Sequence, residues 1–148
     1  MWLFHPIPAR GRTRLVAAIR AAEQATSGEI RIHVQRRCSD DPVRDATRVF
    51  ERLGMTRTAA RNGVLFFLAT RARRFAVIGD TGIHRHVGDA FWQATAAAMT
   101  PHFVRGDLVG GLEAGVRASG EALKQHFPHQ RNDINELSDT ISEGACRT

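Results

Sequence analysis

Two closely spaced apolar segments constrain the fold of this chain more than any other feature. Residues 64–69 form a short, continuous apolar run that is rich in β-forming side chains and follows Asn62-Gly63. This pattern predicts a strand buried on both faces of a sheet. A second strand follows at residues 74–79, after a polar connection about as long as a hairpin loop. The two strands should pair antiparallel. Asn62 and Asp80 would then lie at the same edge of the sheet.

A third strand is predicted earlier in the chain. Residues 29–35 have apolar side chains at every second position, with Glu29 and His33 among the polar residues expected to face outward. An amphipathic helix at residues 42–53 separates this strand from the one at 64–69. A strand, a helix and a strand in succession predict a right-handed crossover with parallel strands.

The remaining segments indicate helices on either side of this sheet. The predicted helices are residues 10–26, 42–53, about 85–99 and 107–126. Val43, Val87, Phe91, Ala94 and Ala98 are among the residues expected to be buried, and Asp107 is expected to cap the last helix.

The expected architecture is therefore an α/β fold. It is a single α/β/α sandwich with a small mixed β-sheet flanked by helices on both faces. At 148 residues the chain is long enough for one domain, predicted at residues 1–128. Residues 129–148 form a polar C-terminal tail, in which Ile134, Leu137 and Ile141 are the apolar residues able to dock against the domain.

Composition narrows the class of protein. No apolar run approaches the roughly 20 residues of a membrane helix, and the N-terminus has apolar residues before basic ones, the reverse of a signal peptide. We therefore expect a cytoplasmic protein without a membrane span. Two isolated cysteines, Cys38 and Cys146, fit a reducing compartment. The formal net charge is +6, but the arginines are spread along the chain, which favours a solvated basic surface over a nucleic-acid site.

The strand directions bring oxygen-bearing side chains to one edge of the predicted sheet. Glu29 begins one strand, Asn62 precedes the next, Asp80 follows the third, and Asp89 lies early in the helix after it. Carboxylate, amide and backbone oxygens suit a hard cation, Ca²⁺ first and Mg²⁺ as the alternative. Asp107 joins this set only if its loop folds back to the same edge. The competing interpretation is that Glu29 and Asp89 pair with surface arginines and that Asp80 caps the turn before His84.

Four stretches resemble the TPM domain in order and spacing. The match covers roughly residues 15–126, and the segments that carry it are SGEIRIHV (27–34), RNGVLFFLA (61–69), RRFAVIGD (73–80) with Gly82-Ile83, and FVRGDLVGGL (103–112). The resemblance implies an α/β/α sandwich. Members of this family include a thylakoid-lumen protein with acid phosphatase activity linked to photosystem repair, bacterial calcium-binding proteins and an animal membrane protein that modulates receptors.

The resemblance also implies an acidic metal site at the sheet edge. In this sequence the resemblance assigns that site to Asp80 and Asp89, with Glu29, Asn62 and Asp107 as further candidate ligands. Many members of the family are exported or membrane-anchored, whereas this chain is expected to be neither.

Three functions follow from the sequence. The first is a divalent-cation module, with Ca²⁺ as the ligand, that acts through contact with a protein partner of unknown identity. The second is a metal-assisted acid phosphatase acting on phosphomonoesters, in which Arg61 or Arg85 holds the phosphate. The third is a structural or interaction domain without a small ligand. No nucleophile is apparent, so the catalytic residues of the second are unknown.

Overall fold

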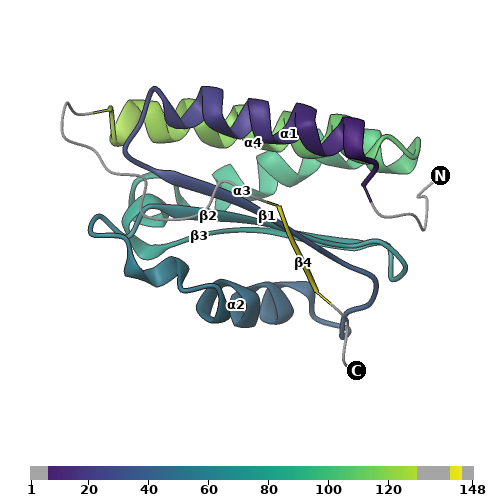
Figure 1. Cartoon of the computed structure of the whole chain (residues 1–148). Helices are drawn as coiled ribbons and strands as arrows, with labels where there is room; N and C mark the ends of the chain where they lie inside the picture. The colour runs from purple at the N-terminus through teal and green to yellow at the C-terminus, as the bar shows by residue number, and fades with distance from the viewer. Residues whose placement is uncertain (1–6, 130–140, 145–148) are drawn as a thin grey trace.

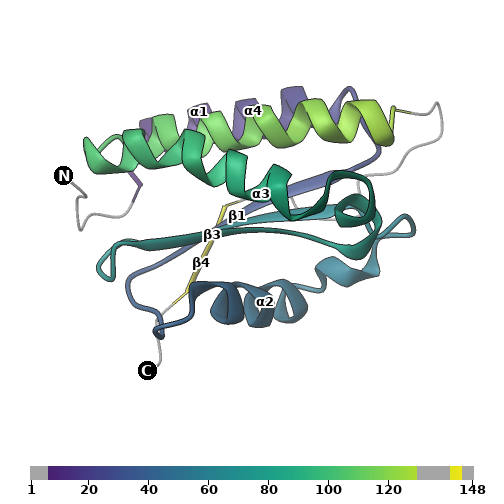
Figure 2. The same cartoon turned by 180° about the vertical axis from the view of Figure 1, so that it is seen from behind.

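The computed structural model describes residues 7–129 and 141–144, which form one layered α/β unit. The elements in chain order are α1 (Ala9–Glu23), β1 (Glu29–Gln35), α2 (Pro42–Arg52), the 3-10 turn η1 (Met55–Arg57), β2 (Gly63–Ala69), β3 (Arg74–Gly79), α3 (Thr81–Val104), α4 (Leu108–His126) and β4 (Ser142–Gly144). Within the described residues the sheet has the strand order β3-β2-β1-β4. Figures 1 and 2 show α1, α3 and α4 over one face and α2 over the other, which confirms the predicted sandwich.

The strand directions also confirm the sequence-based prediction. β1 runs parallel to β2, and β2 runs antiparallel to β3. All seven residues of β2 are buried, because both faces of this strand are covered. Phe66 and Leu68 pack into the core under α1, α3 and α4, whereas Leu65 and Phe67 pack against α2. Full burial of each such side chain contributes about 1.5–3 kcal/mol, so β2 anchors both halves of the core.

The helix after β3 differs from its predicted form. It begins at Thr81 rather than near residue 85, because the Asp80 side chain accepts a hydrogen bond from the Thr81 amide and caps it. Gly88 has non-helical backbone angles (φ 71°, ψ 176°), so α3 comprises two helical segments. The kink changes which side chains face the core. The buried residues are Ile83, Thr95, Met99 and Phe103 rather than the predicted Val87, Phe91, Ala94 and Ala98.

Three side chains have a different exposure from the prediction. His33 and Glu29 were expected to face solvent, yet they are 2% and 4% exposed. For His33 the reason is β4, which pairs beside it and places Ser142 Oγ 2.9 Å from its Nδ1. Val43 was expected to be buried and is 55% exposed in the first turn of α2.

Part of the tail belongs to the sheet. β4 pairs parallel with the end of β1, and Ile141 beside it is only 8% exposed. The predicted docking of Ile141 is therefore confirmed, while Ile134 and Leu137 lie outside the described residues. Figure 1 shows β4 along the β1 side of the sheet, opposite β3.

Candidate functional site at the sheet edge

The start of β1, the start of β2 and the end of β3 form a single edge. Glu29 pairs with Gly63 across β1 and β2, and the Asp80 amide donates to the Gly63 carbonyl oxygen at 2.8 Å. Glu29 and Asp80 thus flank Gly63. Because adjacent strands are about 4.8 Å apart, their backbones are separated by about 10 Å.

Arg61 and Asp80 form a bidentate ion pair at this edge. The guanidinium Nε donates to Asp80 Oδ2 at 2.7 Å, and Nη2 donates to Oδ1 at 2.9 Å. The Asp80 side chain is 4% exposed and the Arg61 side chain is 46% exposed. The hydrogen bond and the charge of Asp80 raise the pKa of Arg61. A bidentate pair of this kind offsets the free-energy cost of burying the charged Asp80 carboxylate.

Backbone contacts fix this pair in place. Arg61 adopts a left-handed conformation (φ 51°), and its carbonyl oxygen accepts a hydrogen bond from the Gly82 amide at 2.8 Å. A Cβ at Gly82 would lie 2.1 Å from the Ala60 carbonyl oxygen. The loop before β2 therefore packs directly on the first turn of α3, and only glycine fits at position 82.

Two further polar side chains, Glu29 and Asn62, are buried nearby. Asn62 is 1% exposed, and its Nδ2 donates to Ser27 Oγ at 3.3 Å. The backbone carbonyl oxygen of Asn62 accepts a hydrogen bond from the Glu29 backbone amide at 3.4 Å. These bonds connect the start of β1 to the start of β2. Glu29, Asn62 and Asp80 therefore bring buried oxygen donors to one edge, as the strand directions predict.

Asp89 and Arg85 lie outside this buried set. Both are exposed on α3. The Asp89 side chain is 86% exposed and lies 3.7 Å from His84 Nε2, beyond the Gly88 kink. His84 Nδ1 in turn accepts a hydrogen bond from the Trp92 indole at 3.0 Å. These contacts tie Asp89 to the outer surface of α3.

Asp107 does not reach the sheet edge. It caps α4, with Oδ1 accepting from the Gly110 amide at 2.9 Å and Oδ2 lying 3.1 Å from His102 Nδ1. These hydrogen bonds lower the pKa of Asp107. The other end of α4 adjoins the start of β1, where Thr26 Oγ1 donates to the Leu123 carbonyl oxygen at 3.0 Å. Since 19 helical residues span about 28 Å, Asp107 lies at the opposite end of the domain.

The chemistry of the edge follows from these contacts. Among residues 7–129 and 141–144, no group of three His, Cys, Asp or Glu side chains is placed to hold a metal ion. The oxygen donors at Glu29, Asn62 and Asp80 are of the type that Ca²⁺ prefers, but Arg61 occupies both Asp80 oxygens. Arg61 and Asp80 were predicted as a phosphate-binding and a metal-binding residue, and their pairing was not predicted, although both were expected at one edge of the sheet.

The fold and this edge define a class of small α/β/α sandwich domains. The TPM domain profile matches residues 7–122, so the chain belongs to the TPM domain family.

Solved structures agree with this assignment. The chain is 39% identical to the BA42 protein of the psychrophilic bacterium Bizionia argentinensis, with a TM-score of 0.87 over 95% of this chain and 97% of that one. It also shares the fold of the N-terminal domain of the cg2496 protein from Corynebacterium glutamicum (17% identity, TM-score 0.63, 96% and 81% coverage). The N-terminal domain of a P. gingivalis protein also shares this fold (21% identity, TM-score 0.65, 84% of this chain and 82% of that one covered). A search of curated proteins finds no significant match. No helix among the described residues is long and apolar enough to cross a bilayer.

Proposed function

We propose that this TPM domain is a divalent-cation module that binds Ca²⁺ at the sheet edge and passes the binding state to a protein partner. The observation that supports this proposal is the burial of Glu29, Asn62 and Asp80 at one edge, where three strand ends meet. Hard cations select such oxygen donors over nitrogen or sulfur. Asp89 is a further candidate ligand only if its exposed side chain leaves His84 and turns toward this edge, and Mg²⁺ is the competing ion.

Arg61 gives the proposed site a switch. Its guanidinium neutralises Asp80, so a cation must displace it before it reaches the carboxylate. The Arg61 side chain is nearly half exposed and can leave toward solvent. Displacement would break the side-chain link between the loop of residues 58–62 and Asp80, while the backbone hydrogen bond from Gly82 to Arg61 still holds the loop on α3. This exchange lowers the cation affinity and converts ion binding into a change of surface that a partner can detect.

Isothermal titration of the chelator-treated protein with Ca²⁺ and with Mg²⁺ tests this proposal. Asp80→Asn keeps a helix-capping side chain but removes the charge, so it should abolish binding. Arg61→Gln removes the competing cation and should strengthen Ca²⁺ binding severalfold. Asp107→Asn changes a capping aspartate at the opposite end of the domain, so this matched control should bind like the wild type.

A metal-assisted phosphatase is the alternative that the family resemblance supplies. It requires Arg61 or Arg85 to hold the phosphate, and Arg61 donates to Asp80 through two nitrogen atoms. The same titrated samples can be assayed with a phosphomonoester. Turnover that depends on Ca²⁺ or Mg²⁺ and is lost in Arg85→Gln would favour the enzyme. Absence of both binding and turnover would leave an interaction domain without a small ligand.

A further inference from the structure

Arginines that are far apart in the sequence lie together at the end of the sheet opposite the proposed cation site. The loop between β2 and β3 packs on the chain that leaves β1, because the Arg71 amide donates to the Arg36 carbonyl oxygen at 2.7 Å. Arg74 Nη1 donates to the Ser39 carbonyl oxygen at 3.0 Å, across 35 positions of the sequence. Figure 1 shows this loop, the start of α2 and the start of α4 at one end of the molecule. The fold thus gathers arginines that sequence spacing keeps apart.

Five exposed arginines define this surface, which we call the arginine end: Arg36, Arg37, Arg44, Arg71 and Arg105. They come from the chain after β1, the first turn of α2, the hairpin loop and the end of α3. Within residues 7–129 and 141–144, none of the five forms an ion pair with a carboxylate. Their guanidinium groups are therefore available to an anionic partner.

The aspartates of this end are engaged in local contacts and are fewer than the arginines. Asp40 lies 3.6 Å from Arg74 Nη1. Asp41 and Asp107 cap α2 and α4, and Asp45 accepts two hydrogen bonds from the loop before α2. These four aspartates face seven arginines, since residues 73 and 74 add to the five above. The end therefore carries a net positive charge.

Two apolar side chains are exposed at the same end. Val43 in the first turn of α2 and Val104 at the end of α3 are each more than half exposed. The Phe75 and Phe103 rings meet edge to face with centroids 4.8 Å apart, which places the end of α3 beside the start of β3 and the hairpin loop. Both valines are thus sequence neighbours of arginines of this surface, and the arginine end combines positive charge with exposed apolar area.

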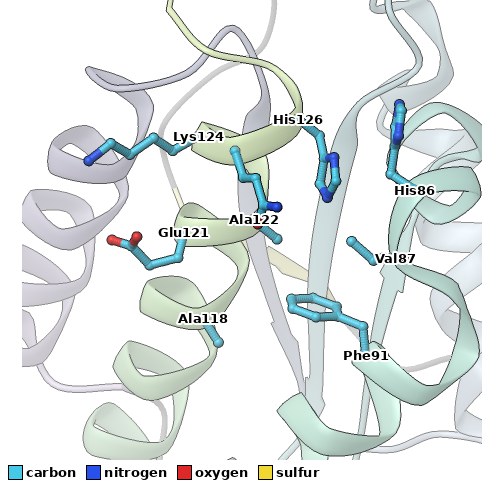
Figure 3. Close-up of a pocket in the computed structure, with 9 residues that line it drawn as sticks. His86, Val87, Phe91, Ala118, Glu121, Ala122, Lys124 and His126 are labelled. Carbon is cyan, nitrogen blue, oxygen red and sulfur yellow. The ribbon is translucent and has the colours of Figure 1, made fainter.

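The arginine end consists of loops and helix ends, and it is separate from the pocket between α3 and α4. That pocket has a volume of about 550 Å³ and is lined by Val87 and Phe91 of α3 and by Ala118 and Ala122 of α4, among others. Figure 3 shows these side chains around one cavity. They lie on the half of α4 that adjoins the start of β1. The arginines extend over several loops instead, which suits a broad surface better than a small ligand.

A lipid bilayer matches both kinds of side chain at this end. Anionic headgroups attract arginines near the membrane surface, and exposed apolar side chains enter the boundary between headgroups and acyl chains. A nucleic acid would use the arginines alone, since its charged backbone offers nothing to the two valines. We propose that the arginine end binds the surface of an anionic lipid bilayer, with guanidinium groups on headgroup phosphates and with Val43 and Val104 in the interface.

This orientation points the proposed cation site away from the bilayer. β1 has seven residues and therefore spans about 23 Å, with Glu29 at its start and the arginine end beyond its last residue. The two sites lie at opposite ends of the strand, so each can be tested without the other.

Co-sedimentation of the full chelator-treated chain with lipid vesicles tests the proposal. The wild type should bind vesicles of equimolar phosphatidylcholine and phosphatidylserine but not phosphatidylcholine alone. Binding should weaken as the salt concentration rises, because ions screen exposed charges. Arg37→Gln/Arg71→Gln removes two charges from the arginine end and should weaken binding at least tenfold. Arg20→Gln/Arg57→Gln removes the same charge from exposed positions in the last turn of α1 and in η1, so this matched control should bind like the wild type.

A second variant separates insertion from adsorption by charge. Val43→Thr/Val104→Thr keeps the net charge and nearly the side-chain shape, and it should weaken vesicle binding severalfold. Far-UV circular dichroism verifies that each variant folds. Failure of the wild type to bind anionic vesicles would overturn the proposal, and so would equal losses in the two arginine double variants or undiminished binding by the valine variant. Tighter binding to a DNA duplex than to vesicles at the same salt concentration would assign the arginine end to nucleic acid instead.

Discussion

Arg61 holds Asp80 through two hydrogen bonds, of 2.7 and 2.9 Å, that join the loop before β2 to the first turn of α3. Asp80 also caps that turn through the Thr81 amide at 2.7 Å. One buried carboxylate therefore serves both as the partner of a cationic side chain and as a helix cap. Both roles stabilise the edge at which we place the cation site.

Replacement of Asp80 separates these two roles. Asp80→Ala removes the cap and the ion pair together and should lower the free energy of unfolding by about 2–4 kcal/mol. Asp80→Asn retains a capping oxygen, so its loss should be smaller by about 1 kcal/mol. Urea denaturation of both variants measures the difference. Equal losses would show that capping by Asp80 contributes nothing measurable.

Gly82 should tolerate no side chain. Gly82→Ala places a Cβ 2.1 Å from the Ala60 carbonyl oxygen and 2.6 Å from that of Arg61. The loop must move away, at a cost of about 2–3 kcal/mol in unfolding free energy. Gly54→Ala is the matched control, because its Cβ would lie 3.4 Å from the nearest atom, in ordinary contact, and only its left-handed backbone (φ 72°, ψ 23°) costs about 1–2 kcal/mol. A smaller loss at position 82 than at position 54 would contradict the close approach of the loop before β2 to α3.

His33 should make stability depend on pH. Burial lowers the pKa of His33, and the charges of Arg52 and Arg31 lower it further, although the Gln35 hydrogen bond opposes them. The unfolded imidazole titrates near 6.5, so below that pH the unfolded chain binds more protons than the native chain. The free energy of unfolding should therefore fall as the pH drops from 7 to 5. His33→Gln should flatten this dependence in chemical denaturation, and an unchanged slope would be evidence against burial of a neutral His33.

The docking of the tail should be measurable at Ile141. This side chain is 8% exposed and packs in the core beneath α1, α3 and α4. Ile141→Ala should reduce the free energy of unfolding by about 2–4 kcal/mol. Val43→Ala, at a position 55% exposed, is the control and should change it by less than about 0.5 kcal/mol. Similar small effects at both positions would argue against a docked tail.

The sequence predicted the central strands well because their local signals agree with the tertiary structure. The continuous apolar run at residues 64–69 and the short loop after it specify a buried strand in a hairpin, and the pairing of β2 with β3 follows. The cap at Asp107 was also predictable, since an aspartate directly before an apolar helix has one common role.

The rest depended on contacts that sequence spacing does not encode. The kink at Gly88 shifts the buried face of α3, and no local pattern marks a glycine that breaks a helix from one that continues it. His33 is buried because β4 returns from more than 100 residues away to cover it. At the candidate site, the strand directions correctly grouped Glu29, Asn62 and Asp80. The place of Asp107 could not be predicted, because the sequence does not show which end of α4 meets this edge of the sheet.

The most direct test of the proposed cation module is thermal unfolding of the chelator-treated protein with Ca²⁺, with Mg²⁺ and without added cation. Ca²⁺ at about 100 times its dissociation constant should add about 2.7 kcal/mol of stability, and Asp80→Asn should abolish the gain. If neither Ca²⁺ nor Mg²⁺ changed the melting temperature of the wild type, the proposed cation module would be contradicted. An equal Ca²⁺-dependent gain in Asp80→Asn would contradict it as well.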